Sequence, residues 1–140
     1  MKHFIDQLMK QPDGPQTTLI QFTKACGCMY LGIGMLFLLF PSIVVHLGIL
    51  SGFQGQEEGL FRMLGLTIAI IGYFYWFGAR TQATSFALST VVDRLLVPFV
   101  FLFIYLVCDV HLMLVLPMAI LDPILAVVAF LLWKKQESSM

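Results

Sequence analysis

Charged side chains are scarce in this chain of 140 residues: only 11% of its positions are Asp, Glu, Lys or Arg, while 59% are hydrophobic. A soluble domain carries charge on about a quarter of its residues. Residues 25–133 contain few charges, namely Glu57, Glu58, Arg62, Arg80, Asp93, Arg94, Asp109 and Asp122. This scarcity excludes a soluble enzyme, a nucleic-acid-binding protein and a disordered tail, and it predicts an integral membrane protein.

Basic runs and cysteines are also few. No basic run is longer than two residues, so the chain offers no polybasic patch, and we expect no nucleic-acid partner. The three cysteines, Cys26, Cys28 and Cys108, are an odd number within apolar segments, which argues against a disulfide framework or a zinc site. We expect them to be buried thiols, and we expect no metal site and no cofactor.

Four long apolar segments make up most of the chain. A membrane-spanning helix needs about 20 mainly apolar residues. We therefore expect an all-α integral membrane four-helix bundle, with kinked, proline-containing spans at about 18–40, 62–79, 86–108 and 112–133. These spans form one membrane domain, residues 17–133.

The segments outside the spans are short. Residues 1–16 form an N-terminal cytoplasmic or interfacial arm, in which Phe4 to Met9 carry apolar residues at the spacing of a short surface helix. Residues 42–50 follow Pro41 and are too few to cross the membrane again, so they either extend the first span past a kink or lie at the interface. Residues 134–140 form a cytoplasmic tail.

The distribution of basic residues predicts the orientation of the chain. With four spans, one side of the membrane holds most of them: Lys2, Lys10, Lys24, Arg80, Arg94, Lys134 and Lys135. The other side holds only Arg62. Because basic residues concentrate on the cytoplasmic side, both termini are expected to be cytoplasmic.

Small residues recur at helical spacing in the first two spans. Faces of this kind let helices approach closely, and two are expected on the first span and one on the second: Gly27 with Gly34, Cys28 with Gly32, and Gly65 with Ala69 and Gly72. Prolines at 41, 98, 117 and 123 predict kinks, and kinked bundles often enclose a cavity.

Asp122 is the residue that most suggests a site. It lies about halfway along the fourth span, where an unpaired ionised carboxylate is expensive, by about 2.5 to 3.5 kcal/mol. Counting back from the turn between the third and fourth spans places Arg94 within reach, so we expect the two to pair. The pair either fixes the packing of the bundle or belongs to a working site.

A hypothetical ligand site follows from these positions: Asp122, Arg94, Asp93, Tyr75 and Trp76. No catalytic residue can be named, because no Ser, Thr or Cys has a recognisable base beside it. On the opposite side of the membrane, Glu58 and Arg62 are spaced i, i+4 in the order that favours an ion pair at a helix start.

The layout of four spans in about 140 residues, with Leu60 to Gly65 opening the second, resembles that of small four-helix membrane proteins. The DoxX-like group and the sterol-pathway scaffold of the endoplasmic reticulum are examples. The resemblance is one of topology and assigns no site residue.

The sequence favours a small accessory, scaffold or assembly protein that acts through helix–helix contacts without catalysis. Its partners would be the lipid bilayer and a membrane protein partner or a second copy. One alternative is a lipid or sterol binder, or a membrane isomerase-type enzyme, that uses Asp122 and Arg94. A second alternative is a small proton-linked transporter.

Overall fold

The computed structural model describes residues 16–108, 110 and 112–138, and its regular elements are all helices. They are α2 (Thr18–Leu39), α3 (Ile43–His46), α4 (Glu57–Arg80), α5 (Thr84–Val107) and α6 (Leu112–Glu137). All but α3 are long and apolar enough to cross a membrane. The all-α class with four apolar spans is therefore confirmed. The short helix expected between Phe4 and Met9 lies outside the described residues.

Local chemistry sets both ends of α2. Thr17 caps the start, because its hydroxyl oxygen accepts a hydrogen bond from the Ile20 N–H at 3.4 Å. The helix ends at Leu39, and Phe40 leaves the helical conformation with φ −128° and ψ 60°. A residue before proline avoids the helical region, so Pro41 accounts for the break. Residues 42–50 consequently do not continue α2 and contain the separate short helix α3.

Two helices extend past the apolar stretches that predicted them. α4 begins at Glu57, before the expected residue 62, and Glu57 and Glu58 occupy its first turn. α6 continues to Glu137, with Lys134 and Lys135 in its last turn. Acidic residues near a helix start and basic residues near its end interact favourably with the helix dipole, so the polar flanks join the helices.

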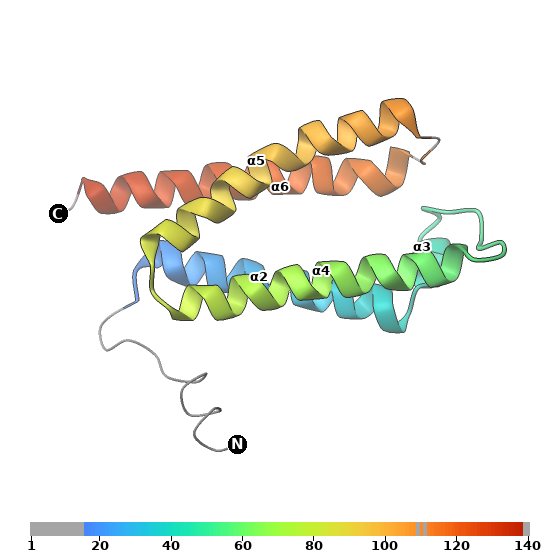
Figure 1. Ribbon diagram of the computed structural model, residues 1–140, viewed down its shortest axis with the longest axis horizontal. Coiled ribbons are helices and arrows are strands. Elements are labelled where there is room, and N and C mark those ends of the chain that lie inside the picture. The colour runs from blue at the N-terminus through green and yellow to red at the C-terminus, as the bar shows by residue number, and fades with distance from the viewer. Residues whose placement is uncertain (1–15, 109, 111, 139–140) are drawn as a thin grey trace, which may run out of the picture.

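The four long helices form two antiparallel hairpins (Figure 1). The first hairpin is α2 with α4, and the second is α5 with α6; contacts within each hairpin far outnumber those between them. The hairpins meet at the end where α4 leads into α5 and diverge toward the α5–α6 connection (Figure 1). We call these the closed end and the open end.

Glycines bring the backbones of α2 and α4 into contact. A Cβ added to Gly34 would lie 2.6 Å from the Gly65 carbonyl oxygen, and one added to Gly27 would lie 2.9 Å from the Gly72 carbonyl oxygen. These distances are shorter than any carbon side chain tolerates. The glycines spaced seven apart on each helix therefore face one another, as expected for a small-residue interface.

The other small-residue face expected on α2 is wrong. Gly32 has open space where its Cβ would stand, and Cys28 is exposed. Cys28 follows Gly27 by one residue, which rotates it about 100° around the helix and away from α4. The expectation that all three thiols are buried holds for Cys26 and fails for Cys28 and Cys108, although all three are free.

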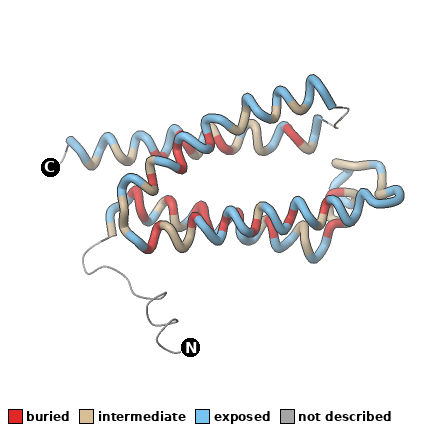
Figure 2. The backbone as a smooth tube through the Cα atoms, in the orientation of Figure 1, coloured by how far each residue is buried: buried red, intermediate tan, exposed pale blue. Residues whose placement is uncertain are grey.

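Alanines hold the closed end together. The four fully covered ones are contributed by α4, α5 and α6: Ala79, Ala87, Ala126 and Ala129. They form one core cluster with Leu19 and Ile20 of α2 and Val91 of α5. Buried positions follow the inner faces of the helices and concentrate where the hairpins meet (Figure 2). Small side chains allow close helix approach in a membrane, so this end is where the hairpins pack.

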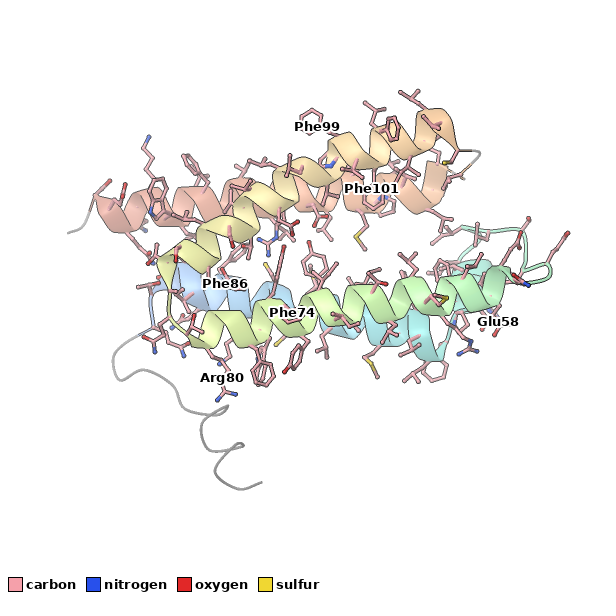
Figure 3. All side chains as sticks on the ribbon, viewed as in Figure 1. Glu58, Phe74, Arg80, Phe86, Phe99 and Phe101 are labelled. Atoms are coloured by element: carbon pink, nitrogen blue, oxygen red, sulfur yellow. The ribbon has the colours of Figure 1, made fainter. Side chains whose placement is uncertain are left out.

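The outward faces of the helices are apolar and exposed. Phe74 on α4 is 61% exposed and Phe99 on α5 is 71% exposed, and the Phe99 ring points away from the first hairpin (Figure 3). A hydrophobic exterior over a sparse polar interior is the arrangement that a lipid environment requires.

The glycine contact yields a matched stability test within α2. Gly34→Leu should lower the midpoint of thermal unfolding in detergent, because the side chain meets the α4 backbone; overpacking of this kind costs about 1–3 kcal/mol. Gly32→Leu, two residues away, should leave the midpoint unchanged. Equal sensitivity of the two positions would contradict the packing described above.

Candidate functional site

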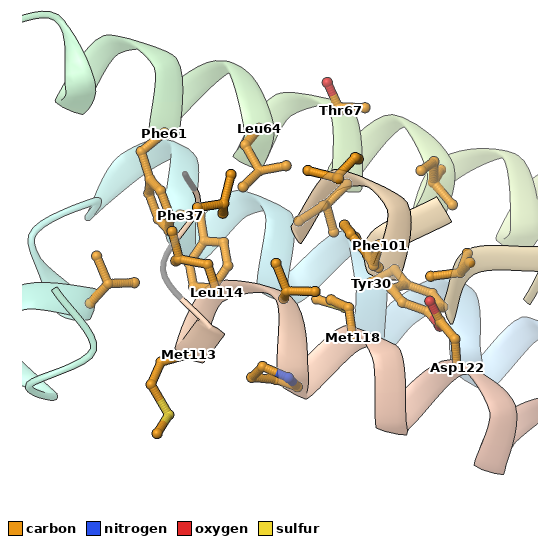
Figure 4. A pocket seen from close by; sticks show the side chains of 18 of the residues that line it. Tyr30, Phe37, Phe61, Leu64, Thr67, Phe101, Met113, Leu114, Met118 and Asp122 are labelled. Carbon is orange, nitrogen blue, oxygen red and sulfur yellow. The ribbon is translucent and has the colours of Figure 1, made fainter. Parts of the chain in front are cut away.

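A pocket of about 420 Å³ lies between the two hairpins and is lined by residues of all four long helices. Ligand-binding pockets commonly have volumes of roughly 300–1,000 Å³. Figure 4 shows Tyr30 and Asp122 together at one end of the pocket, while Phe37, Phe61 and Leu114 lie toward the other. The pocket is therefore polar at one end and apolar at the other.

Two tyrosine–aspartate hydrogen bonds join the hairpins at the polar end. The Tyr30 hydroxyl of α2 donates to the Asp122 carboxylate of α6. The Tyr75 hydroxyl of α4 donates to the Asp93 carboxylate of α5. The two tyrosine rings meet edge to face with centroids 5.7 Å apart. Each hydrogen bond thus has its donor on the first hairpin and its acceptor on the second.

Arg94 lies beside these pairs. Its side chain is 1% exposed, and its guanidinium carbon lies 4.9 Å from the centre of the Tyr75 ring and 5.9 Å from that of Tyr30. Among the residues that the structure describes, none of its three guanidinium nitrogens has a hydrogen-bond partner. We call Tyr30, Tyr75, Asp93, Arg94 and Asp122 the polar cluster.

The direct ion pair expected between Arg94 and Asp122 is not formed within the described part of the chain. The Tyr30 hydroxyl donates to the Asp122 carboxylate instead. Counting residues from the turn predicted that Arg94 and Asp122 lie at a similar depth, and both line the same pocket. It could not foresee that Tyr30 would reach the carboxylate.

The electrostatics of the polar cluster leave Arg94 under-satisfied. A buried charge without hydrogen bonds is costly, and a desolvated cation–π contact recovers about 2 kcal/mol. The aromatic rings and the nearby carboxylates stabilise the cation, but no acceptor among the described residues receives its N–H groups. This part of the pocket is suited to receive an oxygen atom.

The opposite end of the pocket is apolar. Phe37 and Phe61 pack at 4.9 Å between ring centroids, and Val44 of α3 and Met113 of α6 complete this end. Along α6, Asp122 and Met113 are separated by roughly 13 Å at the rise of an α-helix. The pocket therefore suits an elongated, mainly apolar molecule with one polar end.

Most of the residues expected at a site come together. Asp122, Arg94, Asp93 and Tyr75 all line the pocket. Trp76 does not line it and contacts cations on the outer side, with the Arg80 guanidinium carbon 5.2 Å and the Lys24 Nζ 5.7 Å from its ring.

Sequence reasoning missed Tyr30. The signal was present, because Tyr30 lies three residues after Gly27 and four before Gly34. That spacing places the side chain on the α2 face that the packing glycines mark.

The acidic pair at the open end serves the fold. Arg62 Nη2 donates to Glu58 Oε1 at 2.8 Å, which confirms the expected i, i+4 pair. Arg62 Nη1 also donates to the Leu38 carbonyl oxygen near the end of α2, at 2.6 Å. The backbone N–H of Gln54 donates to Glu57. These bonds fix the α2–α4 connection and give Glu57, Glu58 and Arg62 a structural role.

Comparison with protein-family models, with curated proteins and with solved structures finds no match for this chain. Functional inference therefore starts from the pocket and its polar cluster.

The Tyr30–Asp122 bond provides a test of the polar cluster. Tyr30→Phe removes only the hydroxyl and should destabilise the protein by about 1.5–3 kcal/mol, the range for hydrogen bonds to charged groups. Chemical denaturation in mixed micelles measures this loss. Tyr105→Phe, at a tyrosine of α5 that is 42% exposed, should have no effect. In an Asp122→Leu background, Tyr30→Phe should lower the free energy of unfolding by less than it does in the unmodified protein. An equal loss in both backgrounds would show that the Tyr30–Asp122 hydrogen bond does not cause the destabilisation.

Proposed function

We propose that this chain is a multi-pass membrane protein that binds an amphipathic, lipid-like small molecule between its two hairpins. The observation that carries the proposal is the polar cluster at one end of a mainly apolar pocket, with a buried arginine whose nitrogens have no hydrogen-bond partner in the described part of the chain. Pockets with mostly apolar walls and a few convergent polar groups are typical of ligand sites. The ligand would place its polar end at the cluster and its apolar body toward the open end.

A lipid or sterol binder was one of the alternative functions that the sequence suggested. A scaffold that acts through helix contacts does not require a pocket or a buried unpartnered arginine. A proton pathway requires further titratable groups toward both membrane surfaces, and the open end of the pocket is lined by apolar side chains. Ligand binding is sufficient to explain the polar cluster, so we assign no catalytic step.

We also propose that both termini face the cytoplasm and that prolines shape the pocket. The start of α2, the start of α5 and the end of α6 share the closed end, where Thr17, Thr84 and Gln136 lie around one depression. The excess of basic residues belongs to that end. Pro98 and Pro117 lie in the diverging parts of α5 and α6, and an interior proline removes a backbone hydrogen bond and favours a kink.

Two isosteric serine substitutions test the orientation. In a variant with all three native cysteines replaced by alanine, Ser51→Cys at the open end should react with a membrane-impermeant maleimide added outside intact cells. Ser85→Cys at the closed end should react only after the membrane is permeabilised. Labelling of both from outside the cell would contradict a four-span topology.

A pair of valines on α5 tests ligand binding. Val97 lines the pocket, whereas Val100 is 55% exposed on the outer face. Native mass spectrometry of the protein released from nanodiscs containing hexadecanol or cholesterol should detect a one-to-one complex. Val97→Trp should weaken it roughly tenfold or more, equivalent to at least about 1.4 kcal/mol, because the indole fills the pocket.

Val100→Trp is the control and should bind like the unmodified protein. The ligand-binding proposal fails if neither probe forms a complex that Val97→Trp weakens. If the protein instead retains a stoichiometric protein partner and no lipid, the accessory or scaffold function is favoured over ligand binding.

A further inference from the structure

We propose that the ligand carries an uncharged oxygen acceptor, a hydroxyl or carbonyl group, at its polar end, and that Arg94 donates to that oxygen. Anionic headgroups such as sulfate or phosphate are excluded by the charge already present. This inference rests on the proposed ligand-binding function and specifies the chemical class of the ligand.

The first step is the donor inventory. The guanidinium of Arg94 offers five N–H donors and cannot accept, and within the described residues its nitrogens have no acceptor. Both tyrosine hydroxyls already donate to carboxylates. A ligand that offered only further donors would leave Arg94 unsatisfied, so the complementary ligand atom is an acceptor oxygen.

The second step is the charge balance. Arg94 contributes one positive charge, and Asp122 and Asp93 contribute two carboxylates that hold tyrosine hydroxyls. Arg94, Asp93 and Asp122 line the same pocket, so the cation already has two carboxylates in its surroundings. An anionic headgroup would add a further negative charge beside two carboxylates in a water-poor site, where such repulsion is strong. A neutral oxygen satisfies the donors and adds no charge.

The third step is the shape of the remaining pocket. Beyond the polar cluster the walls are apolar as far as Val44 and Met113, apart from Thr67, whose hydroxyl already donates to the Met63 carbonyl oxygen. A second polar group on the ligand would be buried there without a partner, at a cost. The ligand class is therefore a membrane-soluble molecule with an apolar body and a terminal alcohol or ketone.

Two probe pairs that differ only in head charge test this inference. Nanodiscs contain hexadecanol or hexadecyl sulfate, and separately cholesterol or cholesterol sulfate, each at a few mole per cent. Native mass spectrometry measures the bound fraction for each probe. The unmodified protein should prefer the alcohol of at least one pair over its sulfate by about tenfold or more, since the sulfate adds a like charge to the site.

Asparagine variants report on the cause of this preference. Asp122→Asn keeps the shape of the side chain and a carbonyl acceptor for Tyr30 but removes one negative charge. The preference for the alcohol over the sulfate should then fall by about tenfold. Asp93→Asn should also narrow the preference for alcohol over sulfate, because it removes the second carboxylate that lines the pocket. Arg94→Gln should abolish the alcohol complex, whereas Arg62→Gln, outside the pocket, should not change it.

The outcomes separate this inference from the function on which it rests. Equal binding of alcohol and sulfate, or preference for sulfate, overturns the inference while complexes sensitive to Val97→Trp preserve the function. A preference for alcohol that Asp122→Asn leaves unchanged also overturns it. If Arg94→Gln fails to fold, the two asparagine variants still decide the matter. The absence of any complex sensitive to Val97→Trp overturns both.

Discussion

The backbone contact between α2 and α4 is the constraint on which the rest of the molecule depends. Four glycines let the helices approach until no Cβ fits between them, and this spacing brings Tyr30 and Tyr75 edge to face. Both hydroxyls then reach the second hairpin. A wider separation of α2 and α4 would part the tyrosines, so the polar cluster depends on residues that carry no functional group.

The two hairpins have different roles in the pocket. The first is tightly packed along its length and supplies the hydrogen-bond donors. The second has prolines inside both helices and supplies the charged groups. The alanine-rich core at the closed end holds the hairpins together, and their divergence leaves room for the pocket. Its polar end lies where the hairpins begin to separate, so packing and binding share the same residues.

The sequence predicted the helices well because each depends on a local pattern. Apolar length located the four spans, Pro41 ended the first, and glycines spaced seven apart marked the α2–α4 interface. The unequal packing of the hairpins was not predictable, because it depends on how side chains from all four helices fit at the closed end. The start of α4 at Glu57 was also not predicted, because it precedes the apolar stretch. Acidic residues are favourable in the first turn of a helix, so the helix includes them.

The candidate site was predicted in part for the same reason. A charged residue within an apolar span is conspicuous, and so Asp122, Arg94 and Asp93 were identified and share one pocket. A tyrosine in such a span is ordinary, and so Tyr30 was overlooked. The hydrogen bond to Asp122 depends on the juxtaposition of α2 with α6, two helices far apart in the chain. Depth along the membrane placed Arg94 near Asp122 but could not show which group would occupy the carboxylate.

The division of donors and charges between the hairpins also bears on biogenesis. Asp122 and Arg94 are each expensive to leave alone in hydrocarbon, and both lie in helices that follow the first hairpin in the chain. The first hairpin needs neither of them to pack, because its glycines and the Arg62 bonds join α2 to α4. The tyrosine hydroxyls that donate to the carboxylates of α5 and α6 therefore belong to the hairpin that precedes these two helices in the chain. The order of the helices along the chain thus places the two tyrosine donors before the two carboxylates that accept from them.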